Sequence, residues 1–144
     1  MRFGNRGMKA ARHIGDVVCA VIECDGKILI ARRPAGKDLA LKWEFPGGKV
    51  QAGESETDAL HRELFEELRI GVEVLERMTP VEHCYADFSL RLIPFRCRIV
   101  EGLPVACNHE ELALVSVEEL SCHDFPDADL PVIEEYRMKM PCRP

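Results

Sequence analysis

Four acidic side chains near the middle of this 144-residue chain have a spacing that suits metal-assisted phosphate chemistry. Glu54 follows Gly48 in a glycine-rich segment, and the next segment, which predicts an α-helix, carries Glu63, Glu66 and Glu67. Successive helical residues are turned by about 100°, so these three glutamates project from one face. Mg²⁺ prefers oxygen ligands, usually shares them with substrate phosphates, and would remove the repulsion between Glu63 and Glu67. The spacing therefore indicates a divalent-metal site, and a solvated acidic helix face is the alternative.

The same residues resemble the Nudix box. Its pattern is Gly-x5-Glu-x7-Arg-Glu-U-x-Glu-Glu-x-Gly-U, in which U is a bulky aliphatic residue. From Gly48 to Ile70 this chain matches every fixed position except the second glycine, where it has Arg69. Six specified residues, each present at roughly one position in fifteen, make a chance match in a chain of this length rarer than about one in 10^4. The resemblance is therefore specific.

The resemblance implies a Nudix α/β/α sandwich, with a mixed β-sheet between helices, and hydrolysis of a diphosphate linkage in a nucleoside diphosphate derivative. It implies that the Gly47 carbonyl and the carboxylates of Glu63, Glu66 and Glu67 are the metal ligands and catalytic groups. The cofactor would be Mg²⁺ or Mn²⁺, which neutralises phosphate oxygens and lowers the pKa of bound water. One carboxylate would then take the proton of the attacking water, and we favour Glu63 for this role.

Three further box residues would support these groups. Gly48 and Glu54 occupy fixed positions of the pattern, and the resemblance implies that Arg62 pairs with a carboxylate and orients it. An ordinary salt bridge is the alternative role for Arg62 and Glu54.

The segments that flank the box resemble the MutT branch, which converts nucleoside triphosphates to the monophosphate and pyrophosphate. The matching segments are Ile28–Arg33, Trp43–Lys49 and Phe125–Ile133. By position, Arg33 would contact phosphate and Phe45 would pack on the base. The alternatives are a solvated arginine at a strand end and an ordinary core aromatic residue.

Asp129 would contact the base. MutT carries an amide at this position, whereas related members, including CTP pyrophosphohydrolases, carry Asp. An ionised carboxylate only accepts hydrogen bonds, so it would favour cytosine N4 or the donor edge of 8-oxoguanine. Asp129 also precedes Leu130-Pro131, where it could be the N-cap of the last helix. The two roles are compatible.

The chain departs from the family pattern in three places. Arg69 replaces the glycine that ends the box helix in a left-handed conformation, and we expect the helix to continue to Gly71 instead. Asn108 stands where MutT-like enzymes often present a further Glu, with Glu110 or Glu111 displaced by two or three positions. An arginine of the middle strand is replaced by Phe88, near Arg91. The scattered histidines, which include His109, have no zinc-ligand spacing and are interpreted as surface or loop residues.

Several elements must position these groups. Apolar runs at 14–24 and 27–31 flank Asp25-Gly26 and predict a β-hairpin. Ser55 predicts the start of the box helix, whose Leu60, Leu64 and Leu68 form an apolar stripe. Residues 43–48 are expected to form an extended segment that ends in a tight turn. Further strands are expected at 72–75, 88–100 and 112–117, and a last helix at 130–140. Pro94 favours an edge or a bulge in the strand 88–100.

Composition limits the classes of partner. A hydrophobic content of 47% suits a single Nudix hydrolase domain at 14–144, preceded by a mobile tail at 1–13 that lacks the apolar region of a secretory signal. The net charge of −6 argues against a nucleic acid polymer as a partner. No run reaches the roughly 18 apolar residues of a membrane span. Seven cysteines without a Cys-x-x-Cys pair indicate reduced thiols in a cytoplasmic protein.

We therefore expect a metal-dependent nucleoside triphosphate pyrophosphohydrolase that cleans the nucleotide pool of 8-oxo-dGTP or acts on (d)CTP-like substrates. It would be a monomer or a homodimer. One alternative is hydrolysis of a dinucleotide or a nucleotide sugar. Another is a non-catalytic nucleotide-binding Nudix module, although such proteins typically lose box carboxylates and all four are present here. An isomerase on the same scaffold is less consistent with the MutT-like flanks.

Overall fold

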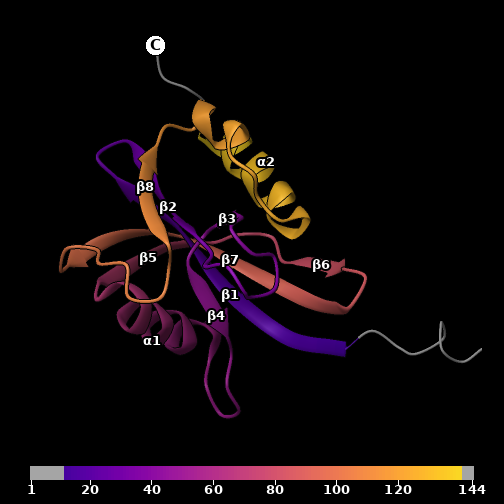
Figure 1. The fold of residues 1–144 in the computed structure, drawn as a ribbon. Helices are drawn as coiled ribbons and strands as arrows, with labels where there is room; N and C mark the ends of the chain where they lie inside the picture. Colours follow the sequence, from indigo (N-terminus) through magenta and orange to yellow (C-terminus); the bar gives the residue numbers. More distant parts are fainter. Residues whose placement is uncertain (1–11, 141–144) are drawn as a thin grey trace, which may run out of the picture.

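The computed structural model describes residues 12–140, which form eight strands, two α-helices and two short 3-10 helices (Figure 1). The strands are β1 (Arg12–Cys24), β2 (Lys27–Arg32), β3 (Trp43–Glu44), β4 (Gly47–Lys49), β5 (Gly71–Arg77), β6 (Val81–Cys84), β7 (Phe88–Glu101) and β8 (Glu111–Val115). The helices are α1 (Glu56–Leu68) and α2 (Leu130–Lys139), with 3-10 helices η1 (Glu118–Cys122) and η2 (Asp127–Asp129).

All eight strands belong to one mixed sheet. Its central order is β3-β2-β1-β7-β5, with β4 paired to β1, β6 to β7 and β8 to β2. The long pairing of β1 with β7 is parallel, whereas the other pairings are antiparallel. The predicted hairpin is confirmed: Asp25 and Gly26 have φ values of 49° and 81°, as a tight hairpin turn requires, and they join β1 to β2.

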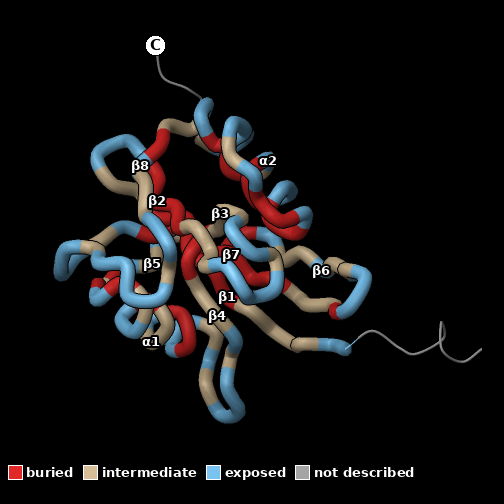
Figure 2. The backbone as a smooth tube through the Cα atoms, viewed as in Figure 1, coloured by how far each residue is buried: buried red, intermediate tan, exposed pale blue. Residues whose placement is uncertain are grey.

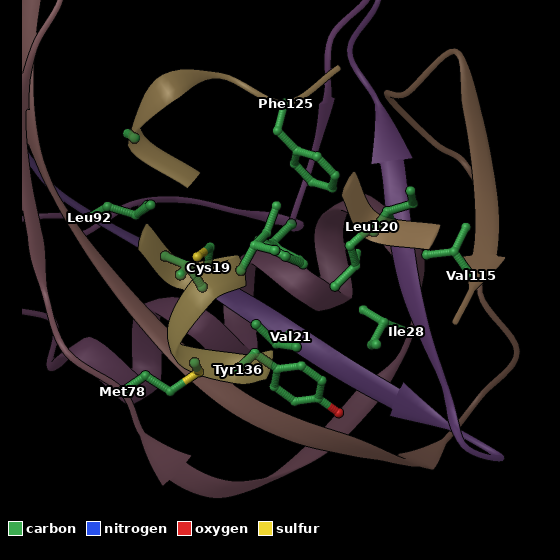
Figure 3. Close-up of a cluster of buried hydrophobic side chains, with 14 residues drawn as sticks. Cys19, Val21, Ile28, Met78, Leu92, Val115, Leu120, Phe125 and Tyr136 are labelled. Atoms are coloured by element: carbon green, nitrogen blue, oxygen red, sulfur yellow. The ribbon is translucent and has the colours of Figure 1, made fainter. Parts of the chain in front are cut away.

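Alternate residues of the central strands face two different hydrophobic layers. Val18, Ala20 and Ile22 of β1 belong to the cluster that contains the leucine stripe of α1. Cys19 and Val21 belong to the cluster that contains α2, which Figure 3 shows in detail. The two helices lie on opposite sides of the sheet (Figure 1), and buried residues concentrate along the central strands (Figure 2). The predicted α/β/α sandwich is confirmed.

The box helix begins as predicted and ends differently. The Ser55 side chain accepts a hydrogen bond of 3.0 Å from the backbone N–H of Asp58, which confirms the N-cap. The predicted end at Gly71 is wrong, because Arg69 itself adopts the left-handed conformation with φ 60° and ψ 38°, and Gly71 already begins β5. The Arg69 N–H donates to the Phe65 carbonyl at 2.9 Å, and its guanidinium lies 5.3 Å from the centre of the Phe65 ring. These contacts offset part of the cost of the conformation.

An edge or a bulge was predicted at Pro94. The edge is wrong, because Pro94 lies in a central strand, and the nearest register shift, between β5 and β7, lies opposite residues 96–97 and not at Pro94. On one side β7 pairs with β1 without interruption at this point. On the other side β6 pairs with β7 up to Leu92, and β5 pairs with it from Phe95. The Pro94 carbonyl accepts a hydrogen bond of 2.8 Å from Met78, in the connection between those two strands. Proline has no N–H to donate to a neighbouring strand. It is tolerated at position 94 because β7 has no paired strand on that side between the end of β6 and the start of β5.

The boundary of the predicted tail is also two residues too late, because Arg12 and His13 are the first residues of β1. The remainder of that tail, residues 1–11, lies outside the described residues, as does Cys142. The six cysteines between residues 12 and 140 are free thiols. Within the same range, no helix has the length and apolar character that crossing a membrane requires.

Candidate active site

A cavity of about 600 Å³ lies between β1, β4 and α1 at one end and η2 at the other, within the range typical of small-molecule sites. Its lining includes two loops, residues 33–39 and 108–109. Five acidic residues line it, namely Asp38, Glu44, Glu63, Glu67 and Asp129, together with a group of apolar and aromatic side chains that includes Phe45. The cavity therefore has an acidic end on the box helix and a more apolar end near η2.

Two glycines allow α1 to lie directly against β4. A Cβ atom at Gly48 would be 2.3 Å from the carboxyl carbon of Glu63, so only glycine lets this carboxylate approach the strand. A Cβ atom at Gly47 would be 1.9 Å from the carbonyl oxygen of Val18 on the paired strand β1. The sequence Gly47-Gly48 thus brings the backbone of β4, Glu63 and Glu67 together at the acidic end.

Glu67 has the environment that best suits a cation. Burial, followed by the charges of Glu44 and Glu63, raises the pKa of Glu67 to about 9, and a hydrogen bond from the backbone N–H of Gly47 offsets this in part. Its Oε1 atom is buried and has no hydrogen-bond partner among residues 12–140. A divalent cation would satisfy this oxygen and remove the repulsion from Glu63, so the residues present fit a hard metal ion.

The site is not a complete protein cage for that ion. Across residues 12–140, no three carboxylate, imidazole or thiolate groups are gathered closely enough to hold a metal. The Glu66 side chain is 55% exposed, does not line the cavity, and accepts a hydrogen bond of 3.2 Å from Arg62. The structure thus brings Glu63 and Glu67 together and leaves Glu66 on the outer side, so its ligand role stays a prediction. Ligands from substrate phosphates would complete such a site.

Arg62 is held by five hydrogen bonds. It binds the Glu54 carboxylate through two of them, at 2.6 and 3.0 Å, and the Lys49 carbonyl at 3.0 Å. The remaining bonds reach Glu63 at 3.1 Å and Glu66 at 3.2 Å. The bond from Arg62 is the main cause that holds the pKa of Glu54 below its usual value. Arg62 is therefore fixed by Glu54 and can orient Glu63 from a rigid position.

Asp129 and Phe45 lie together at the other end of the cavity. Asp129 is only 7% exposed, and burial, followed by the charge of Glu44, raises its pKa well above the usual value. It accepts a hydrogen bond from the backbone N–H of Phe45 but none from the helix that follows, so the side-chain cap of α2 does not form. Phe45 packs on Phe125 with ring centres 5.2 Å apart and also lines the cavity. It is both a core residue and a candidate base contact.

A chain of three polar side chains occupies the middle of the cavity. Arg33 donates from Nη1 to Glu44 Oε1 at 2.8 Å, and from Nε to the Asp38 carbonyl at 2.8 Å. The other carboxylate oxygen of Glu44 is 2.8 Å from His109 Nε2. His109 was predicted to be a surface or loop residue. It lies in the loop between β7 and β8, but it is not a surface residue, since its side chain is 4% exposed and lines the cavity. Sequence reasoning missed Glu44, although it adjoins Phe45 in the Trp43–Lys49 match.

Neither candidate for a displaced outer glutamate reaches the cavity. Asn108 lines it, whereas Glu110 and Glu111 do not. The backbone N–H of Glu110 donates to the Arg32 carbonyl at 2.8 Å, and the Glu111 carboxylate lies 3.8 Å from the Arg32 guanidinium. Glu111 is the partner of Arg32 in the register between β8 and β2, so both glutamates are held next to Arg32 and away from the cavity.

Several other lining residues were not predicted as site residues. Phe88 lines the cavity, whereas the nearby Arg91 is paired with Asp16 at 3.5 Å. Cys19, Lys37 and Tyr85 also line it, and the sequence carries no local signal for them. The pKa of the buried Cys19 thiol is raised well above its usual value, chiefly by burial, so it is a poor nucleophile.

Comparison with known proteins agrees with this arrangement. The family model described as the NUDIX domain matches residues 17–135. The chain is 39% identical over 129 residues to the CTP pyrophosphohydrolase of Escherichia coli, covering 90% of this chain and 96% of that protein. It is 33% identical over 113 residues to the 8-oxo-dGTP diphosphatase of the same organism, covering 78% and 88%. The solution structure of the E. coli ORF135 protein superposes with a TM-score of 0.77 and 38% identity, over 92% of this chain and 96% of that one. The chain therefore belongs to the Nudix family.

Proposed function

We propose that this protein hydrolyses nucleoside triphosphates to the monophosphate and pyrophosphate, with Mg²⁺ or Mn²⁺ as cofactor. The observation that carries the proposal is one cavity with Glu63 and Glu67 at one end and Phe45 and Asp129 at the other. A nucleotide has the same division, with phosphates that need a cation at one end and a flat, hydrogen-bonding base at the other. The names of the two E. coli relatives support the same reaction.

At the acidic end, the Gly47 carbonyl, Glu63 and Glu67 would hold the metal, with Glu66 approaching from the exposed side. When bound, the ion would neutralise phosphate oxygens and lower the pKa of the attacking water. Glu63, whose carboxylate Arg62 orients through a 3.1 Å hydrogen bond, would accept the proton of that water.

At the middle of the cavity, Arg33 would bind phosphate. It is 25% exposed there and already paired to Glu44, so its guanidinium is oriented before substrate arrives. Preorganisation of this kind lowers the entropic cost of binding.

At the apolar end, Phe45 would pack on the base and Asp129 would read its edge. A carboxyl that is kept neutral by burial both donates and accepts hydrogen bonds, whereas an ionised one only accepts. Cytosine offers an amine beside an acceptor nitrogen, and 8-oxoguanine also offers donors beside an acceptor. We therefore propose (d)CTP-like substrates or 8-oxo-dGTP, and a role in sanitising the nucleotide pool of the cytoplasm, by a monomer or homodimer.

The two alternatives make different demands on the cavity. A dinucleotide or nucleotide sugar would need room beyond the phosphates for a second large group. A non-catalytic module would have no use for the close approach of Glu63 to β4, which only glycine at position 48 permits. The approach of Glu63 to β4 therefore supports a hydrolase over a non-catalytic module, and the substrate panel below separates the two kinds of hydrolase.

The test is turnover with Mg²⁺ across all dNTPs and NTPs, 8-oxo-dGTP, 5-methyl-dCTP, a dinucleoside polyphosphate and a nucleotide sugar, with pyrophosphate and phosphate measured separately. Pyrophosphate from one or two triphosphates supports the proposal and names the base, and Asp129→Asn should then change the ranking of those bases. Turnover of only the dinucleotide or the sugar, or binding without turnover, would replace the proposal by the corresponding alternative.

A further inference from the structure

The loop between β7 and β8 presents His109 to the cavity through main-chain contacts. The backbone N–H groups of Val105 and Cys107 donate to the last carbonyls of α1, those of Leu68 and Glu67, at 3.0 and 3.2 Å. The residue after His109 is held in turn by β2, through the 2.8 Å hydrogen bond to the Arg32 carbonyl. The position of His109 is therefore set by the backbone on both sides, and its side chain is free to serve another purpose.

Within the described range, the imidazole of His109 makes one hydrogen bond, and its other nitrogen is unpaired. Its Nε2 atom lies 2.8 Å from Glu44 Oε2, and because an ionised carboxylate can only accept, Nε2 carries the hydrogen. Its Nδ1 atom is buried and has no hydrogen-bond partner in the part of the chain that the structure describes. An unpaired buried nitrogen costs free energy, so the stability of the free protein does not explain a histidine here. The bond to Glu44 is what the ring contributes.

Glu44 connects this ring to Arg33. One of its oxygens accepts from His109 and the other from Arg33, both at 2.8 Å, and its side chain is 18% exposed. A carboxylate held at both oxygens has a fixed plane, and a guanidinium paired to it takes its orientation from that plane. Without His109, the Glu44 carboxylate could rotate, and Arg33 would follow it.

We propose that His109 is a positioning residue for nucleotide binding, which fixes Glu44 and through it orients Arg33 towards the substrate phosphates. The proposal rests on the proposed function, since it assumes a nucleotide in the cavity. The reacting groups are elsewhere, on α1 and β4, so the effect falls on binding and not on the chemical step. Uniform loss of binding raises KM and leaves kcat unchanged.

Three substitutions separate this role from a structural one. His109→Phe keeps the ring shape and removes both nitrogens, and we expect KM and the Kd of a nucleotide to rise about tenfold while kcat stays within about threefold. His109→Gln places an amide N–H near the position of Nε2 and should restore KM to within about threefold of wild type. His109→Asn reaches only the position of Nδ1 and should not restore it. The melting temperature of His109→Phe should change little, because removal of the unpaired nitrogen offsets the loss of the hydrogen bond to Glu44.

His123→Phe is the matched control. His123 is half-buried and bonded to the Glu119 carbonyl at 3.0 Å, and it does not line the cavity, so KM should not change. A purely structural role for His109 would instead lower the melting temperature in all three variants, with no rescue by Gln, and that result would overturn the proposal.

One further measurement distinguishes a failure of the proposed function from a failure of the positioning role. It is the Kd of the α,β-methylene analogues of dCTP and dGTP, measured by calorimetry with Mg²⁺. Wild-type protein that binds an analogue but releases no pyrophosphate from any triphosphate refutes the proposed function alone. Equal Kd values for wild type and His109→Phe refute the positioning role alone. Absence of binding to wild type refutes both.

Discussion

Replacement of the two glycines of β4, Gly47 and Gly48, by alanine should separate folding from catalysis. At Gly48, the added Cβ would lie 2.3 Å from the Glu63 carboxyl carbon and 2.4 and 2.6 Å from its oxygens, whereas ordinary contacts begin near 3.4 Å. The carboxylate must therefore move by roughly 1 Å, and because it ends a flexible side chain, it can move without the backbone. At Gly47, the added Cβ would lie 1.9 Å from the Val18 carbonyl oxygen, so the pairing of β4 with β1 must open.

The expected magnitudes differ accordingly. A displacement of about 1 Å in a catalytic group costs about 10²-fold in rate, so Gly48→Ala should lower kcat by about that factor and change stability by less than about 1 kcal/mol. Gly47→Ala overpacks a backbone contact and should cost about 3 kcal/mol or more, which corresponds to a fall in Tm of at least about 6 °C in a domain of this size.

The assay is pyrophosphate release at saturating triphosphate, with thermal unfolding measured in the same buffer. Gly71→Ala is the control, because its added Cβ would meet only the flexible Glu101 side chain, at 3.3 Å, and both readouts should match wild type. A Gly48→Ala protein with kcat within about threefold of wild type would refute the reasoning, since it would mean that the position of Glu63 against β4 is not needed.

Three further predictions follow from single contacts. Because the pKa of Glu67 is raised to about 9, its ionisation costs stability as pH rises from the ordinary value of 4.5 towards 9. Without metal, Glu67→Gln should therefore have a higher melting temperature than wild type at about pH 7–8, and the difference should shrink towards about pH 5. A difference in melting temperature that stays constant with pH would contradict this. Arg69→Gly removes a left-handed non-glycine residue and should add about 1 kcal/mol, or about 2–4 °C in Tm; an unchanged Tm would mean that the Phe65 contact offsets the whole cost. Arg62→Lys loses the paired bonds to Glu54, so kcat/KM should fall about tenfold or more, and a wild-type value would show that Glu63 needs no orientation.

Local patterns predicted the fold well where the sequence itself holds the information. Alternation in the first two strands, the Asp25-Gly26 turn and the leucine stripe of α1 depend on residues close in the chain, and each is confirmed. Pro94 and Arg69 were misjudged because tertiary neighbours decide their positions: a change of paired strand at Pro94, and the close approach of Gly102 to the Arg69 carbonyl.

In the site, too, the residues that belong to a local pattern were predicted, and those that depend on tertiary contacts were not. Glu63, Glu67 and Arg62 were found because the box is a contiguous pattern. Glu44 and His109 were missed because their contact joins residues 65 positions apart, and neither has a local signal that distinguishes it from a surface residue. The role proposed for His109 is argued from its burial and from an unpaired nitrogen, and both are properties of the folded chain.

The central claim is metal-dependent hydrolysis of a triphosphate by the carboxylates of the box helix. Pyrophosphate release by wild type and by Glu67→Gln, measured side by side across a Mg²⁺ titration with the triphosphates of the panel, tests it most directly. The account predicts that pyrophosphate release by wild type increases with Mg²⁺ and saturates, and that Glu67→Gln, although folded, releases almost none. Pyrophosphate release without added metal after chelation, or equal release by the two proteins, would contradict it.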